Sequence, residues 1–332
     1  MRLDAYTKAD SLGSLADEWR GLLQTAIHNS IFATPEWAET WWRSFGDGRE
    51  LCLLTLREGN ELVGIVPLFI ERDGQRRLVR FLGGVDVTDY EDIIARPGTE
   101  GDVWQQALEY LDGHHLELDL HNVPGQSATV AFFRQLSRDD RYVVAVQEED
   151  VCPTIDPLPA DWESYLEALP RKERHELRRK LRRLMGDPDL NAQLCWQQPD
   201  LRKAMDDFVR LHRLSSPDKS EFMTPRMVGF FNGVAQMCRE HGWLCLGFLT
   251  IDNTPVSAIM AFDYGDTFYL YNSGYDPAYD ELSVGLLLKA QSIEHAIVLG
   301  KKRYDFLQGS ERYKYDLGGQ NTYVYQISCV RR

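Results

Sequence analysis

Hydrophobic positions along the chain cluster into short apolar runs separated by amphipathic segments. In the first half, LCLLTLRE and ELVGIVPLFIE predict two strands, and the Gly-Asn pair at 59–60 between them is typical of a hairpin turn. The Thr-Pro-Glu sequence at 34–36 predicts a helix start, since it offers an N-cap hydroxyl, a proline at the first helical position and an acid near the positive helix end. Of the tryptophans that follow at 37, 41 and 42, two are expected in the core.

The amino-acid composition changes near residue 150, where VCPTIDPLPADW contains three prolines and predicts an extended connector. This places a domain boundary between 1–150 and 151–332, and Asp161 is expected to cap a helix that begins at Trp162.

Beyond the boundary, GWLCLGFLTI, PVSAIMAFDY and TFYLYNSGY predict a strand meander. A helix is expected from Val284 to Leu299, with Ser283 as N-cap and Gly300 after its end, followed by the strands KRYDFL and NTYVYQISCV. The pattern predicts an α+β fold in which two domains each carry a mixed, mostly antiparallel sheet flanked by helices.

Composition narrows the function classes. At 332 residues, 43% of them hydrophobic, the chain can bury two cores, and its net charge of −14 disfavours general binding of DNA or anionic membranes. No apolar run has the length of a membrane span, and the first residues lack the pattern of a signal peptide, so a cytoplasmic protein is expected. Six scattered cysteines and eight histidines show no metal-ligand spacing, so no metal is expected; His212 and His295 are each more typical of structural histidines.

One segment that is expected to be helical is strongly basic, although the chain as a whole is acidic. RKERHELRRKLRRL at 171–184 carries eight basic residues against two acids, and its leucines form one apolar stripe. Arg174 and Arg178 lie beside that stripe, where guanidinium groups can contact a phosphate or carboxylate in a groove. The alternative is a solvated face that pairs with acids elsewhere in the chain.

The segments YLEALPRKERHELRRKLRRL, YLYNSGYDPAYDELSVGLLL and KRYDFLQGSERYKYDLGG resemble a branch of the GNAT acyltransferase superfamily that is often labelled cellulose-biosynthesis-associated. This branch is similar to the Fem-type peptidoglycan aminoacyltransferases. FATPEWAETWWRSFG and FLGGVDVTDYEDII extend the resemblance over nearly the whole chain. The resemblance implies tandem GNAT-like domains, with acyl transfer to an amine by direct attack in the second domain.

The resemblance also implies an acetyl-CoA or other acyl-CoA donor, held between splayed strands and at a helix N-terminus. Here the usual Q/R-x-x-G-x-G/A signature is reduced to one glycine in DELSVGL, with two acids before it. Ser283, Val284 and Gly285 can still offer N–H groups to a pyrophosphate, although a simple helix cap would also explain the serine.

For chemistry, Lys314 resembles the lysine of the aromatic-Lys-x-x-x-Gly motif of Fem-type enzymes, which implies a role in stabilising charge on the acyl oxygen. A lysine that binds donor phosphate, or a plain surface lysine, is the alternative. Glu311 and Asp305 are candidate bases, and Asp305 can equally be a structural acid because it alternates with its aromatic neighbours.

An acceptor is expected to contact residues near the end of the TFYLYNSGY strand and in the segment around Lys314. The predicted acceptor contacts are Tyr271, Asn272, Tyr275 and Tyr313. In the first half, Asp89 and Tyr90 match the Asp-Tyr signature of the family, which implies that they border a groove between the domains; a turn with a packed tyrosine explains them equally well.

Three functions therefore compete. The first is an N-acyltransferase that uses acyl-CoA and a sugar amine, a nucleotide-linked amine or another small amine. The second is aminoacyl transfer from charged tRNA, which the net charge of −14 disfavours. The third is a non-catalytic GNAT-fold protein in polysaccharide production. In the first two, the basic helix is expected to supply a local wall for the anionic ligand.

Overall fold

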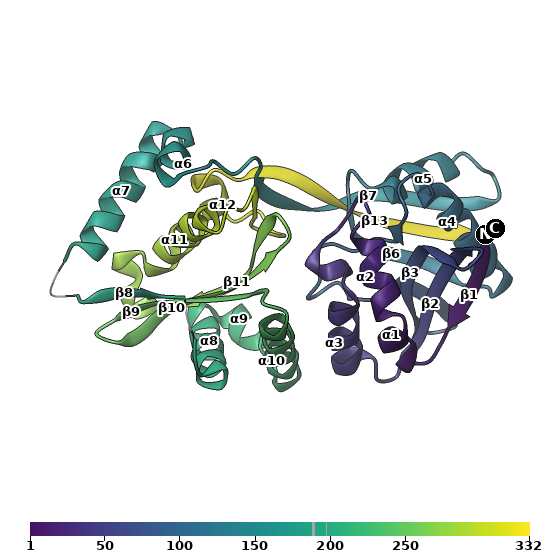
Figure 1. The fold of residues 1–332 in the computed structure, drawn as a ribbon, viewed down its shortest axis with the longest axis horizontal. Coiled ribbons are helices and arrows are strands. Elements are labelled where there is room, and N and C mark those ends of the chain that lie inside the picture. The colour runs from purple at the N-terminus through teal and green to yellow at the C-terminus, as the bar shows by residue number, and fades with distance from the viewer. Residues whose placement is uncertain (188–189, 197) are drawn as a thin grey trace. The chain divides into compact units, whose positions relative to one another are not determined.

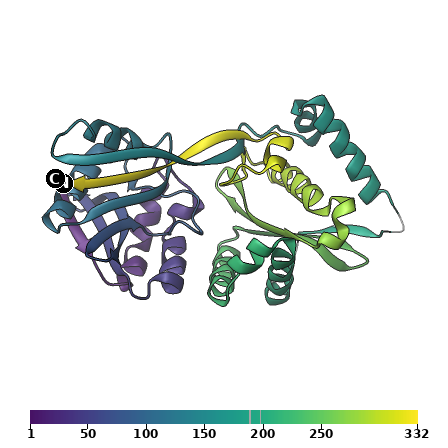
Figure 2. The same cartoon turned by 180° about the vertical axis from the view of Figure 1, so that it is seen from behind.

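The computed structural model describes residues 1–187, 190–196 and 198–332, and these fold into two compact units. The first unit comprises Met1–Val151 and Thr322–Arg332, and the second comprises Cys152–Asn321. Each unit is a sheet flanked by helices, as Figures 1 and 2 show from opposite sides. The expected α+β class is confirmed.

The first unit is built on a mostly antiparallel sheet. Its strands follow the order β1-β2-β3-β4-β6-β13-β7, and β5 pairs with β3. Their bounds are β1 Arg2–Tyr6, β2 Glu50–Glu58, β3 Glu61–Asp73, β4 Arg76–Phe81, β5 Ile94–Ala95, β6 Glu117–Pro124, β7 Tyr142–Ile155 and β13 Gln320–Arg331. Only the contact between β4 and β6 is parallel among the strand pairs whose direction is described. The helices are α1 Asp10–Ser14, α2 Ala16–Leu23, η1 Ile31–Ala33, α3 Pro35–Phe45, α4 Glu100–Gly113 and α5 Ala128–Leu136.

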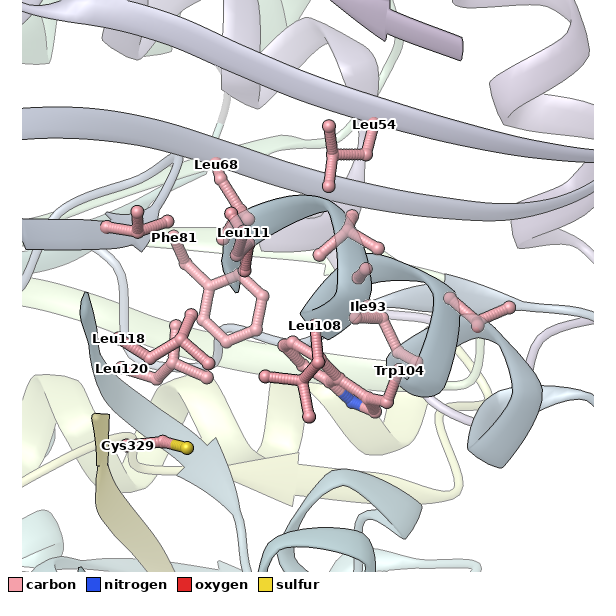
Figure 3. Packing of buried hydrophobic residues seen from close by; sticks show 14 of the residues in the cluster. Leu54, Leu68, Phe81, Ile93, Trp104, Leu108, Leu111, Leu118, Leu120 and Cys329 are labelled. Carbon is pink, nitrogen blue, oxygen red and sulfur yellow. The ribbon is translucent and has the colours of Figure 1, made fainter. Parts of the chain in front are cut away.

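The core of this unit forms where α4 packs on the sheet (Figure 3). Trp104 and Leu108 on α4 lie against buried strand residues such as Leu68 and Phe81, and Cys329 joins this cluster from β13 at the far end of the chain. Burying each large apolar side chain contributes roughly 1.5–3 kcal/mol. The apolar runs predicted as strands therefore become the inner face of a sheet.

Local predictions in this unit are confirmed. The Thr34 side chain accepts a hydrogen bond from the Trp37 amide at the start of α3, and Gly59 takes a positive φ of 60° in the turn between β2 and β3. Trp37 and Trp41 are both buried.

The second unit has the strand order β7-β12-β11-β10-β9-β8. The bounds of the added strands are β8 Ala192–Cys195, β9 Leu244–Ile251, β10 Thr254–Tyr264, β11 Thr267–Tyr275 and β12 Arg303–Asp305. β11 and β12 are parallel, and the other pairs are antiparallel. The helices are α6 Trp162–Ala168, α7 Arg171–Met185, α8 Leu201–Ser215, α9 Pro217–Phe222, α10 Pro225–Glu240, η2 Pro277–Leu282, α11 Val284–Val298 and α12 Arg312–Asp316.

Helices cover both faces of this second sheet. In both views α8, α9 and α10 lie on one face, and α11 and α12 lie on the other (Figures 1 and 2). Asp161 caps α6 through the Ser164 amide, as predicted, and Gly300 follows α11 with a φ of 73°. Within the ranges that the structure describes, no helix is both long and apolar enough to cross a membrane.

Two sequence expectations differ from the structure. The sequence predicts that the last strand belongs to the second domain, whereas Thr322–Arg332 belong to the first unit, because β13 pairs with β6. Ser283 was expected to cap α11 through its hydroxyl, but it makes no side-chain cap hydrogen bond. Its backbone is left-handed, with φ 56° and ψ 34°, because η2 ends immediately before it; a capping serine needs extended backbone.

Candidate functional site

The parallel strands β11 and β12 pair over a short distance and then part. Their register joins Thr267–Tyr269 to Arg303–Asp305, where β12 ends, while β11 continues to Tyr275. Leu307, two residues after β12, has a positive φ of 59°, so the chain turns away here. Within the described part of the chain, the end of β11 therefore has no strand neighbour on its β12 side.

A bulge lies at the same place on β11. Met260 of β10 is opposite Asn272, and Ala261 is opposite Leu270, which leaves Tyr271 as the extra residue. A bulge bends its strand and increases the local twist, so it helps β11 to diverge from β12.

The first turn of α11 lies beside the end of β11. A methyl group at Gly285 would lie 3.1 Å from Cδ1 of the Tyr275 ring, so glycine permits this close packing. The first N–H groups of any α-helix have no intrahelical acceptor, and the helix dipole makes this end positive. Val284 and Gly285 are buried there, whereas Ser283 is half-buried. Three of the five predicted donor-binding residues thus lie at one helix terminus, next to the open end of β11.

The basic helix α7 contacts both α11 and η2, but Arg174 and Arg178 point to α6. Arg178 forms an ion pair with Glu163, and Nη1 of Arg174 donates to the Glu167 carbonyl oxygen at 3.3 Å. Arg183 reaches η2 instead, and its Nη1 donates to the Glu281 carbonyl oxygen at 3.4 Å. Arg183 is thus an α7 arginine that contacts the segment before α11, and the sequence pattern did not single it out.

Lys314 is almost fully buried, with 1% of its side chain exposed, so it is not a surface lysine. Its Nζ donates to three carbonyl oxygens of the loop after β12, at 3.0 Å to Leu307, 2.5 Å to Gln308 and 3.1 Å to Gly309. Oε2 of Glu311 lies 3.0 Å away as well. An ammonium has three hydrogens, so these acceptors use them all, and Lys314 fixes the shape of this loop.

The two candidate bases, Asp305 and Glu311, differ in how accessible their carboxylates are to a substrate. Asp305 is 1% exposed; its Oδ1 accepts from the Leu307 amide at 2.9 Å and its Oδ2 lies 3.1 Å from Nη2 of Arg303. These bonds fix the turn after β12, so the contacts of Asp305 favour a structural role over a role as base. The Glu311 side chain is 57% exposed and forms its ion pair through one oxygen. Glu311 is thus the carboxylate that a substrate can reach.

Two further lysines lie close to this region. Lys289 on α11 is only 8% exposed; its Nζ lies 4.5 Å from the centroid of the Tyr313 ring and 3.4 Å from the Gly285 carbonyl oxygen. Burial and then the positive charge of Lys219 lower the pKa of Lys289 to about 7, although Glu311 acts in the opposite sense. Nζ of Lys219 donates to the Ser273 carbonyl oxygen at 2.5 Å, near the end of β11. Burial lowers the pKa of Lys219 too.

The pattern of α11 contains a signal for Lys289. In VGLLLKAQSIEHAIV it is the only basic residue in the apolar first half, and it lies four residues after Gly285, on the buried face. Lys219 has no comparable signal, because α9 is short and polar.

The predicted acceptor residues do not all share one face. Tyr271 packs between Phe231 and Phe262, with ring centroids 5.5 Å and 4.8 Å away, on the side covered by α10. Asn272 hydrogen bonds to His212, the buried histidine of α8, whose pKa burial and Lys219 lower to about 4. The other two residues lie beside α11: the Tyr275 ring packs against Gly285, and the Tyr313 ring lies below Nζ of Lys289.

Asp89 and Tyr90 lie in the first unit, in the segment between β4 and β5. The Tyr90 ring lies against Phe32, with centroids 6.1 Å apart. The residue after them, Glu91, is buried, and burial raises its pKa well above the ordinary value. The packed tyrosine agrees with the structural alternative, and a substrate role for Asp89 and Tyr90 stays a prediction.

Comparison with known proteins supports the same fold. Residues 171–315 match the family described as "Acetyltransferase (GNAT) domain", whereas no curated protein sequence matches the chain. The crystal structure of FemX aligns with a TM-score of 0.69 at 10% identity, over 98% of this chain and 97% of that one. A conserved protein of unknown function from Bacteroides thetaiotaomicron VPI-5482 aligns with a TM-score of 0.65 at 12% identity, over 99% of this chain and 100% of that one.

A tandem GNAT protein from the clavulanic acid biosynthesis pathway aligns with a TM-score of 0.52 at 13% identity, over 99% of this chain and 98% of that one. These identities establish a likeness of fold. They confirm the expected tandem GNAT-like and Fem-like architecture, while the cellulose-associated branch stays a prediction.

Proposed function

We propose that the second unit transfers an acyl group from acyl-CoA to an amine acceptor, with the thioester held where β11 and β12 part. The parting of these strands beside the first turn of α11 is the observation that carries the proposal. Beyond Tyr269 the backbone of β11 has no β12 partner, and side chains of Lys219, Ser215 and Asn272 bind the polar groups of Ser273 and Tyr275 instead. An extended amide-containing donor would replace these side-chain hydrogen bonds. The match of residues 171–315 to a GNAT domain supports the same assignment.

The pyrophosphate of the donor would lie at the first turn of α11, on the N–H groups of Val284 and Gly285. The positive helix end favours an anion there. Asp280 and Glu281 oppose it, and Arg183 of the basic helix, which contacts the Glu281 carbonyl, offsets part of this negative charge. With two acids and one arginine near the helix end, we expect donor affinity to be lower than at a site with the glycine-rich signature. The positive charge of α7 partly neutralises the acids of η2.

For the transfer itself, we assign proton acceptance to Glu311. The acceptor nitrogen attacks the thioester carbonyl carbon, a C–N bond forms, the C–S bond breaks, and the sulfur leaves as a thiolate. The amine proton passes to the exposed Glu311 carboxylate, directly or through water, and can then reach the departing sulfur. Lys314 acts by positioning, because it holds the loop that precedes Glu311 and makes an ion pair with that residue.

The acceptor is proposed to be a small amine, a sugar amine or a nucleotide-linked amine. Aminoacyl transfer from charged tRNA is less favoured, since a chain of net charge −14 offers little general attraction for a polyanion. The Arg174 and Arg178 side chains, engaged with α6, add no free anion-binding wall beside α11.

The proposal is tested by thiol release. The protein is mixed with acetyl-CoA and each member of an amine panel, and free CoA is followed with a thiol reagent. Amine-dependent release that falls at least roughly tenfold in Glu311→Gln, with acetyl-CoA affinity unchanged, would support the assignment. Parallel reactions with aminoacyl-tRNA decide the alternative: transfer from tRNA alone would refute the acyl-CoA function. Acetyl-CoA binding without release for any amine would favour the non-catalytic function.

A further inference from the structure

Three lysines from three helices converge on one carboxylate beside the open end of β11. Lys219 comes from α9, Lys289 from α11 and Lys314 from α12, and each interacts electrostatically with Glu311 or pairs with it. Lys289 also feels the charges of Lys219 and Lys314. We refer to these four residues as the lysine cluster.

The members of the lysine cluster differ in how their charges are satisfied. Lys314 is saturated by three carbonyl oxygens and Glu311. Lys219 holds one carbonyl oxygen, that of Ser273, and Lys289 has a single long contact to Gly285 and the face of the Tyr313 ring. Among the residues that the structure describes, neither Lys219 nor Lys289 forms an ion pair with a carboxylate.

This arrangement leaves excess positive charge in a partly buried place, since Lys289 and Lys314 are buried and Lys219 is half-buried. Three ammonium groups face one carboxylate, and an uncompensated buried charge is costly. Burial lowers the pKa of Lys219, and burial together with the charges of Lys219 and Lys314 lowers that of Lys289 to about 7, so part of the cost is relieved when Lys289 loses its proton. A bound anion would supply the missing charge and draw a proton back onto Lys289.

We propose that Lys219 and Lys289 bind a carboxylate of the substrate. The inference rests on the proposed function, and it narrows the substrate to a dicarboxylic acyl donor or to an acceptor that carries a carboxylate, such as an amino acid. The site adjoins the first turn of α11: Lys289 lies one turn along the helix from Gly285, whose carbonyl oxygen it contacts, and Lys219 contacts β11 two residues before Tyr275. A carboxylate suits a site beside these lysines better than a phosphate, because a monoanion loses less hydration on burial.

Two matched pairs of ligands distinguish the two sources. Calorimetric titrations near pH 7.5 compare succinyl-CoA with acetyl-CoA, and L-alanine with L-alaninamide in the presence of CoA. One carboxylate ligand is expected to bind at least roughly tenfold more tightly than its partner that lacks this carboxylate. Repeating that titration in buffers of different ionisation enthalpy should show proton uptake, since the anion restores the charge of Lys289.

Variants then locate the effect. Lys289→Met and Lys219→Met should each abolish the preference and the proton uptake while acetyl-CoA affinity stays unchanged. Methionine keeps most of the side-chain length and suits a buried site, so both variants are expected to fold. Lys302→Met is the matched control, because Lys302 is exposed and lies in a surface ion pair with Asp266.

Each outcome decides something. If acetyl-CoA binds but neither carboxylate ligand is preferred, or the preference survives in Lys289→Met, the carboxylate site is refuted and the acyl-CoA function stands. A loss of turnover in Lys289→Met without loss of binding would make Lys289 a proton carrier and also overturn the proposal. If no CoA ligand binds, the proposed function fails; titration with succinate alone then decides the site, since binding lost in Lys289→Met would retain it and no binding would remove it.

Discussion

Ser283 offers a substitution that separates helix stability from donor binding. It occupies the N-cap position of α11 with a left-handed backbone, φ 56°, and its hydroxyl caps nothing. Aspartate and asparagine adopt this conformation more readily than other side chains except glycine. Ser283→Asp therefore introduces a negative charge at the proposed pyrophosphate site without backbone strain, and Ser283→Asn is the neutral control of the same shape.

The two variants are expected to have similar stability. A negative charge at a helix N-terminus stabilises by about 0.3–1 kcal/mol. Repulsion from the nearby Asp280 and Glu281 removes a comparable amount. The free energies of unfolding of Ser283→Asp and Ser283→Asn should thus agree within about 1 kcal/mol.

Binding should differ much more. A carboxylate about 7 Å from a doubly charged pyrophosphate, at an effective dielectric constant of about 40, costs roughly 2 kcal/mol. Acetyl-CoA affinity in Ser283→Asp should therefore be roughly thirtyfold weaker than in Ser283→Asn. The difference should shrink as salt is raised, because exposed charges are screened.

Calorimetry and urea unfolding on both variants test this reasoning. Equal acetyl-CoA affinities in the aspartate and asparagine variants would show that the donor phosphates bind elsewhere. A loss of binding matched by a loss of stability would instead mean that Ser283 acts only through the fold.

Three further predictions concern the second unit. Lys314→Met should lower the free energy of unfolding by about 3 kcal/mol, because it strips the donor from three loop carbonyls, and urea unfolding measures this loss. Gly274→Ala should cost about 1–3 kcal/mol in the same assay, because its methyl group would overlap the backbone nitrogen and Cα of His212. His212 has a folded-state pKa of about 4, below its ordinary 6.5, so the unfolded chain binds the extra proton between these values. Stability should therefore be full above about pH 6.5 and fall by roughly 2 kcal/mol by pH 5, as urea midpoints can show.

Matched variants make these tests specific. Lys302→Met removes an exposed lysine and should leave the free energy of unfolding nearly unchanged. Gly101→Ala adds a methyl group to α4 where nothing lies within 4 Å, so it should be neutral or slightly stabilising. For the pH effect, His212→Gln should flatten the dependence; an unaltered dependence in that variant would assign it to another group.

Local elements follow from the sequence where one side chain decides the backbone. Thr34 and Asp161 cap their helices as predicted because the cap oxygen and the amide it accepts lie three residues apart. Ser283 fails as a cap because the preceding η2 imposes a left-handed backbone, which no pattern within α11 reveals. The pairing of β13 with β6 was equally hidden, since it joins residues about two hundred positions apart.

The site could be predicted only in part. The motif around Lys314 led to the correct loop, yet the sequence could not show that the ammonium turns inward onto carbonyl oxygens. The charge of α7 was evident, but its partners depend on tertiary packing, which directs Arg178 to α6 and Arg183 to η2. Lys219 was missed because its role comes from a hydrogen bond to β11 and from the charge of Glu311, and the sequence of α9 indicates neither contact.

The most direct test of the acyl-CoA function is a calorimetric titration of the wild-type protein with acetyl-CoA and with desulfo-CoA. Saturable binding of both ligands, weakened in Ser283→Asp and retained in Ser283→Asn, is the predicted result. No binding of either ligand at millimolar concentration would contradict the proposed donor site beside the parting strands β11 and β12.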